Sequence, residues 1–139
     1  MSKSDDRVSQ DLKKRILEEM TVETSGVLAK NFDLAKRFVR VTKTGKVEVL
    51  IKDKVTGQEQ ILLYLIGKQY AKEAGFLTTN AVSNKELMDE LGIPEGSLWP
   101  WLMFLRKSPG IKQVKEEKQV FHFIPINLVE AVLKSIEEK

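Results

Sequence analysis

The sequence predicts an α+β fold that is mainly helical, and three observations lead to that prediction. Apolar residues recur at three- and four-residue spacing over most of the 139-residue chain, as on the buried face of a helix. Residues typical of strands are confined to short runs that occur in pairs, each pair joined by turn residues. The apolar content of 42% is enough for one compact domain with an extension, or for two very small domains.

Residues 1–25 are predicted to form an N-terminal amphipathic helix. Val8, Leu12, Ile16 and Met20 follow one another at four-residue spacing and make one apolar stripe on a polar helix. A stripe this narrow needs another surface to pack on, so we expect it to contact either the rest of the chain or a second copy of it.

Residues 26–57 are predicted to form a short helix followed by a basic β-hairpin. Apolar residues indicate the helix over residues 27–35. Strand-rich runs at residues 37–42 and 47–52 flank a turn, in which Gly45 supplies the positive φ that a tight turn needs.

The next part of the chain is predicted to hold the main core helix, over residues 58–74, and a short capped helix after it. Ser83 and Glu86 have the spacing of a capping box, in which the serine hydroxyl accepts from the Glu86 amide and the Glu86 carboxylate reaches back to the Ser83 amide. Gly92 is placed where a helix C-terminal glycine belongs.

A third helix over residues 97–107 and a hairpin follow. The hairpin is predicted from β-prone runs at residues 111–115 and 119–124. Strand alternation then puts the two phenylalanines on either side of His122 toward the core and turns His122 outward, where it has no functional role.

Residues 127–139 are predicted to form a C-terminal helix that begins at Asn127, a good N-cap residue. Its apolar face is narrow, as is that of the predicted N-terminal helix. Such faces are typical of helices that pair between subunits, so we expect a homodimer; the alternative is a monomer that packs both faces internally.

The order of the elements predicted over residues 58–126 is helix, capped short helix, turn, second helix and hairpin, which is that of a winged helix-turn-helix. A helix of about two turns is not stable alone in water, so Leu87 and Leu91 must pack at once. The surface that receives them is the apolar face of the next helix, made by Leu98, Leu102 and Leu105. The predicted fold is therefore a winged helix-turn-helix with an N-terminal helix and β-hairpin extension.

Short motifs within this segment also carry a family resemblance, namely residues 82–87, residues 90–97, Leu102 and residues 105–107. Together they resemble archaeal winged-helix proteins of the transcription-regulator type, and the resemblance is limited to residues 58–125. It implies DNA binding, with the second helix of the motif in the major groove and the hairpin against the backbone or the minor groove.

Carried over position by position, the resemblance implies two sets of DNA contacts. The candidates that would face the groove are Ser97, Trp99, Pro100, Met103 and Arg106. The candidates for the backbone and the hairpin are Lys85, Lys107, Lys112, Lys115 and Lys118.

Positive charge is concentrated in the N-terminal part of the chain. Residues 1–57 hold 13 Lys and Arg against 9 Asp and Glu, whereas residues 58–139 hold 10 against 11. A basic patch of this kind attracts polyanions, although a solvated lysine-rich surface accounts for it equally well. We expect the cations of the hairpin predicted within residues 26–57 to form a second DNA-binding surface. They are Arg37, Arg40, Lys43 and Lys46.

The predicted groove helix departs from the family pattern because its outward side is apolar. A turn of about 100° per residue places Trp99, Met103 and Phe104 away from the leucines of the core. Such a face is normally covered, here by the N-terminal region, by a second subunit, or by a partner protein or unstacked bases. The alternative function is therefore a protein–protein interaction or assembly module that uses these three side chains.

Several function classes are excluded or disfavoured by composition. The chain has no cysteine and one histidine, which excludes a cysteine-ligated metal site and a histidine-rich one. No catalytic constellation or cofactor loop is recognisable, so we expect a non-enzymatic protein without cofactor or metal. With no apolar run of transmembrane length and no signal-peptide core, we expect a cytoplasmic DNA-binding regulator or accessory factor that does not bind membranes.

Overall fold

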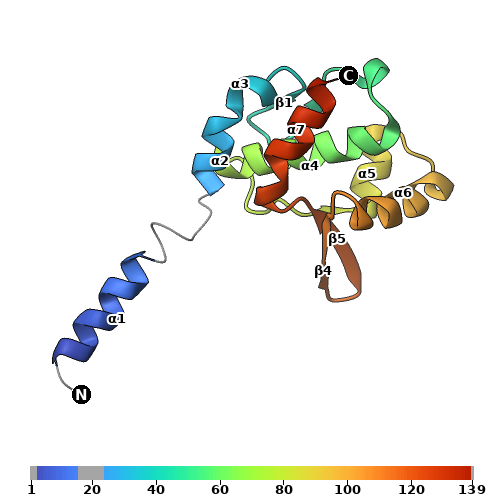
Figure 1. The fold of residues 1–139 in the computed structure, drawn as a ribbon. Coiled ribbons are helices and arrows are strands. Elements are labelled where there is room, and N and C mark those ends of the chain that lie inside the picture. Colours follow the sequence, from blue (N-terminus) through green and yellow to red (C-terminus); the bar gives the residue numbers. More distant parts are fainter. Residues whose placement is uncertain (1–2, 16–23, 139) are drawn as a thin grey trace.

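The structure is a computed structural model that describes residues 3–15 and 24–138, and its fold is α+β and mainly helical, as predicted (Figure 1). The described α-helices are α1 (Lys3–Arg15), α2 (Thr24–Lys30), α3 (Phe32–Ala35), α4 (Gly57–Glu73), α5 (Asn84–Leu91), α6 (Glu95–Lys107) and α7 (Val129–Glu137). The described strands are β1 (Val39–Val41), β2 (Val47–Val49), β3 (Val82–Ser83), β4 (Lys112–Glu116) and β5 (Gln119–Phe123). β1 pairs with β2, and the other strands form an antiparallel sheet in the order β3-β5-β4.

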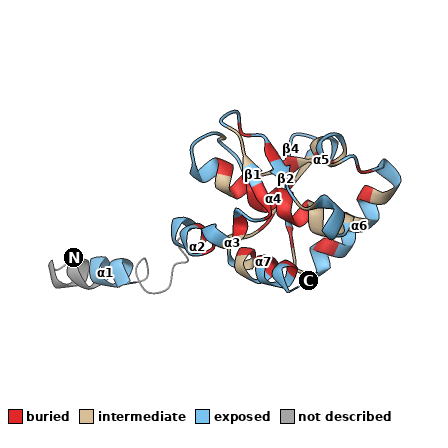
Figure 2. Cartoon of the chain, turned by 90° about the horizontal axis from the view of Figure 1, so that it is seen from above, coloured by how far each residue is buried: buried red, intermediate tan, exposed pale blue. Residues whose placement is uncertain are grey.

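Helix α4 lies at the centre of the core, and its middle is buried on every side (Figure 2). Thr56 caps it: the Thr56 hydroxyl accepts from the Glu59 amide at 3.2 Å, and the Glu59 carboxylate accepts from the Thr56 amide at 2.9 Å. The predicted helix is confirmed, and burial extends around it, since Leu63 and Tyr64 are also fully buried. Apolar residues all round a helix indicate burial from all sides.

The β1–β2 hairpin packs on α4. Val47 and Val49 are buried, and Val47 lies so close to α4 that a Cβ added at Gly67 would be 2.4 Å from its Cγ1. Gly45 has a φ of +87°, as the turn prediction requires. The strands are three residues long, shorter than predicted, so Arg37 lies in the turn before β1.

The helices that flank α4 differ from the prediction at their ends. The single helix predicted over residues 27–35 is wrong, because α2 and α3 are separated at Asn31, whose side-chain amide donates to the Val27 carbonyl at 2.9 Å. Asn127 is not the cap of α7; it lies in a 3₁₀ turn (Ile126–Leu128), and α7 begins after it. The apolar face of α7 is buried within the chain.

The segment from α4 to β5 holds α5 and α6 against one edge of the core. The Ser83 hydroxyl accepts from the Glu86 amide at 3.1 Å, as predicted, and Gly92 ends α5 with a φ of +68°. The second half of the predicted capping box is wrong, because the Glu86 carboxylate is turned to Tyr64 and Lys68 instead.

The buried residues form one apolar cluster, to which the β1–β2 hairpin, α4, α5, α6 and α7 all contribute. The side chains described for α1, residues 9–15, are exposed, and that of Leu12 is 55% exposed. The other residues of the predicted N-terminal stripe, at 8, 16 and 20, lie outside the described side chains. In the part of the chain that the structure describes, no helix combines the length and the hydrophobicity needed to cross a membrane.

Candidate functional site

The outward side of α6 and the β4–β5 hairpin next to it form the surface that we call the α6–hairpin surface. The inward side of α6 is formed by the three leucines predicted to face the core, all of them buried. On the outward side Trp99 is 67% exposed, Met103 is 36% exposed and Arg106 is exposed. All five residues of β4 are exposed, so the hairpin stands out from the body of the molecule (Figure 1).

Helix α6 begins at Glu95, two residues earlier than predicted, which places Pro100 beyond its first turn. Because proline has no amide hydrogen, the Gly96 carbonyl does not receive the helical hydrogen bond that residue 100 would otherwise donate. Ser97 is half-buried near the start of α6, whereas Pro100 is exposed.

Two hollows separate α6 from the hairpin. One, of about 500 Å³, is lined by Lys85, Glu95 and Lys118. The other, of about 160 Å³, is lined by Met103 and Arg106. Both are bordered by Asn84, Trp99 and Val120. Predicted residues from α5, α6 and the hairpin thus border two hollows that share part of their lining.

Six cations of the α6–hairpin surface and its margin are exposed: Lys85, Arg106, Lys107, Lys112, Lys115 and Lys118. Among the described residues, none of them forms an ion pair with a carboxylate. Exposed acids at Glu95, Glu116 and Glu117 moderate the local charge without forming such pairs. An anion can therefore bind these cations without displacing a carboxylate.

His122 faces the core, so its predicted outward orientation is wrong. β5 lies between β3 and β4, where His122 is opposite the buried Val82, and only 1% of the histidine is exposed. Its Nε2 lies 2.6 Å from the Asn84 Oδ1 and donates to it, and its Nδ1 has no partner. Burial, together with the positive charge of Arg106, lowers the pKa of His122 to about 4. Phe121 and Phe123, predicted to face the core, are only half-buried.

The outward apolar residues of α6 do not form one face. Trp99 and Met103 border the smaller hollow beside the hairpin, whereas Phe104, 57% exposed, borders a different pocket of about 380 Å³ between α6, α7 and the start of α4. Trp101 packs against Gly57. Because Trp99 and Phe104 are exposed, the described part of the N-terminal region does not cover the helix, and that proposed covering is not observed.

The predicted hairpin cations lie elsewhere. In Figure 1, β1 lies on one side of α4 and the β4–β5 hairpin on the other. Arg37 pairs with Glu137 at 2.9 Å, and Lys46 is 4.0 Å from Glu90. Arg40 and Lys43 are exposed. The residues predicted to bind DNA therefore fall on two separate surfaces.

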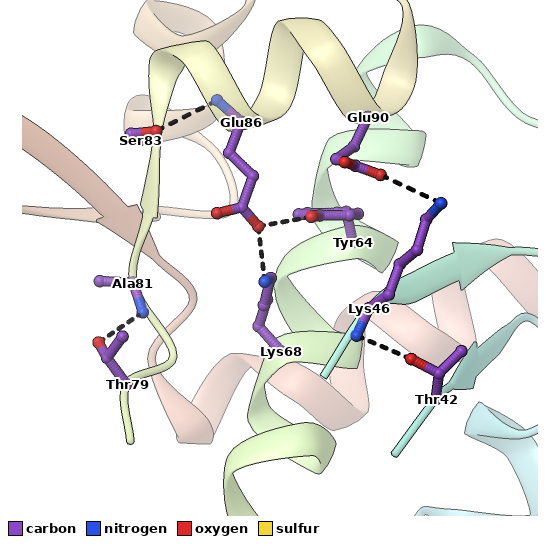
Figure 3. A network of polar contacts seen from close by, with 9 residues as sticks. All are labelled: Thr42, Lys46, Tyr64, Lys68, Thr79, Ala81, Ser83, Glu86 and Glu90. Carbon is purple, nitrogen blue, oxygen red and sulfur yellow. Dashed lines mark hydrogen bonds and ion pairs between the residues drawn. The ribbon is translucent and has the colours of Figure 1, made fainter. Parts of the chain in front are cut away.

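A polar network holds α5 against α4 and so positions the edge of the α6–hairpin surface (Figure 3). The Glu86 carboxylate accepts from the Tyr64 hydroxyl at 2.5 Å and lies 2.6 Å from the ammonium of Lys68, which is 8% exposed. Burial and the neighbouring carboxylate raise the pKa of Tyr64 far above its usual value, so it remains neutral.

Sequence reasoning missed Asn84 and Gln113, which line the smaller hollow together with His122. Gln113 could have been found from strand pairing. It lies opposite His122 on β4, so it accompanies His122 once the histidine is known to face inward. No metal site accompanies them: among the described residues, no group of three or more His, Asp or Glu could hold an ion. No protein-family model, curated protein or solved structure matches the chain.

Proposed function

We propose that this chain is a winged-helix protein that binds duplex DNA and catalyses no reaction. The succession α4-β3-α5-α6-β4-β5, with a sheet of order β3-β5-β4, supports this fold assignment. The observation that carries the function is the set of six exposed cations around α6 and the β4–β5 hairpin that form no ion pair with any described carboxylate. In this proposal α6 enters the major groove and the hairpin contacts the backbone.

Phosphate contacts supply most of the affinity in this proposal. Five of the six cations are lysines, which act as point charges, and Arg106 is the single arginine able to form a bidentate base contact. We therefore expect strong dependence on salt and modest preference for sequence. A B-form duplex is the expected ligand, because the deep, narrow major groove of A-form RNA does not admit a helix.

Reversing charge on β4 is expected to weaken duplex binding. The double variant Lys112→Glu/Lys115→Glu changes two exposed side chains, so the fold is retained. We expect its affinity for a labelled duplex, measured by fluorescence anisotropy, to fall by about tenfold or more at moderate salt, with a shallower salt dependence.

The control for this test is Lys52→Glu/Lys54→Glu, which makes the same change of net charge at two exposed lysines outside the α6–hairpin surface. We expect this control to bind the duplex within about threefold of the unchanged protein, because only general attraction is reduced. Equal loss in the two double variants would count against the α6–hairpin surface.

A second candidate function, a protein-interaction module, is favoured by the exposure of Trp99, since exposed tryptophans are typical centres of protein interfaces. In this alternative a partner packs on Trp99 and Met103, and Phe104 belongs to a separate surface. Trp99→Ala, tested in the same titrations and by sedimentation, separates the candidates. Loss of self-association in a protein that binds no duplex at low salt favours the second, whereas weaker duplex binding by the variant favours the first.

Two further expectations belong to this proposal. The cellular role is that of a cytoplasmic transcription regulator or accessory factor. We also expect a homodimer, with α1 as the pairing helix because its Leu12 is exposed. Helix α7 is not available for pairing, because its apolar face is buried within the chain.

A further inference from the structure

A second pocket, distant from the α6–hairpin surface, combines aromatic and cationic side chains. It has a volume of about 520 Å³ and is formed by α3, β1 and the last turn of α4. Its lining contains two aromatic rings and three cations: Phe32, Tyr70, Lys36, Arg37 and Arg40. In Figure 1, α3 and β1 lie across α4 from the β4–β5 hairpin, so this pocket is not part of the surface proposed to bind duplex DNA.

The aromatic part of the pocket is held in place on one side and open on the other. The Tyr70 hydroxyl donates to the Leu28 carbonyl at 2.7 Å, and burial raises the pKa of Tyr70 to about 12, so the ring is neutral. The Phe32 ring lies 6.3 Å from the Tyr70 ring, between centroids, yet Phe32 is 52% exposed. An exposed phenylalanine supported by a fixed tyrosine provides a surface on which a planar ligand can stack.

The cations border this aromatic surface. The Lys36 ammonium lies over one face of the Phe32 ring, 5.5 Å from its centroid, and 3.1 Å from the Asp33 carboxylate. Arg37 is paired with Glu137, and Arg40 is exposed with no ion pair to a described residue. The two ion pairs are exposed and contribute little stability, so a phosphate can replace either carboxylate.

We propose that this pocket binds one unpaired nucleobase and its phosphate, as part of a single-stranded nucleic acid or as a free nucleotide. A base stacks on Phe32, and its phosphate lies among Arg40, Lys36 and Arg37. A base within a duplex cannot use the pocket, because both of its faces are already stacked. The volume is within the range of small-ligand pockets. This inference does not rest on the proposed duplex binding and stands if that proposal fails.

The test uses the full chain and a labelled ten-nucleotide thymidine oligomer, with affinity measured by fluorescence anisotropy. Phe32→Ala is expected to weaken binding by about tenfold, and Phe32→Trp to retain it, because stacking needs only an aromatic face. The matched control is Phe104→Ala, which removes another exposed phenylalanine, one outside this pocket. Thermal unfolding of each variant shows whether the fold is retained.

Competition identifies the source of the ligand. Displacement of the oligomer by a mononucleotide shows that a free nucleotide is sufficient, and displacement only by an oligomer shows that a strand is needed; both support the pocket. Three results would overturn it: no oligomer binding at low salt, equal binding by Phe32→Ala and Phe104→Ala, or equally effective displacement by polyaspartate, which has charge without rings.

Discussion

Glu86→Ala is expected to lower the free energy of unfolding by about 2–4 kcal/mol. The carboxylate of Glu86 is the partner of the nearly buried Lys68 ammonium and of the buried Tyr64 hydroxyl (Figure 3). Its removal leaves one charge and one hydroxyl without their partner in a place that water reaches poorly. The measurement is urea denaturation at pH 7, followed by circular dichroism.

The matched variant is Lys68→Met, which keeps the volume and removes the buried charge. The Glu86 side chain is 32% exposed and still accepts from Tyr64, so water can solvate the carboxylate that remains. We therefore expect the loss of unfolding free energy in Lys68→Met to be smaller than that in Glu86→Ala by at least about 1 kcal/mol. Losses below about 1 kcal/mol in both variants would show that the network does not hold α5 in place, and equal larger losses would contradict the expected difference between the two partners.

Acidification from pH 7 to pH 4 is expected to destabilise the fold by roughly 3 kcal/mol through His122. The pKa of His122 is about 4 in the folded chain, whereas a histidine in the unfolded chain has the ordinary pKa of about 6.5. Between these values the unfolded chain binds a proton that the folded chain does not. Stability is therefore highest above about pH 6.5 and falls as the pH is lowered, and the loss through His122 levels off below about pH 4.

His122→Gln isolates this contribution from that of the carboxylates, because glutamine does not titrate and its amide can donate to Asn84. The measurement is the unfolding free energy of both proteins at intervals from pH 4 to pH 7. We expect the unchanged protein to lose stability more steeply on acidification. Parallel curves would mean that the burial of His122 does not control its protonation.

Local sequence signals predicted much of the fold, because they depend on neighbours in the chain. The spacing of apolar residues located α4, α5 and α6, and the positive φ of Gly45 and Gly92 followed from their places at a turn and a helix end. Two of the incorrect predictions, the orientations of the Glu86 and His122 side chains, depend on distant partners. Glu86 is turned away from its own cap by Lys68 and Tyr64, which are on another helix.

The orientation of β5 shows the same limit. Alternation along the strand indicated that His122 and its two phenylalanine neighbours face opposite sides, but not which side faces the core. That choice follows from Asn84 and Val82, each about 40 positions away. The prediction takes a polar residue to face water, but the hydrogen bond that His122 donates to Asn84 allows it to be buried.

The candidate site was predictable only in part. The outward position of Trp99 and Met103 follows from the helical period alone, and the structure places both beside the hairpin. The separation of the cations into two surfaces on either side of α4 was not predictable, since it depends on how the β1–β2 hairpin packs on α4. The association of Phe32 with Tyr70 and Arg40 was not predictable either, because it joins residues of α3, α4 and β1.

The central claim, that the α6–hairpin surface binds duplex DNA through phosphates, is tested most directly by measuring affinity for a generic labelled duplex at several salt concentrations. We predict that the logarithm of the association constant falls linearly with the logarithm of salt concentration, with a slope of about −4 or steeper, as expected for four or more phosphate contacts. No binding at low salt, or an affinity that salt leaves unchanged, would contradict the claim.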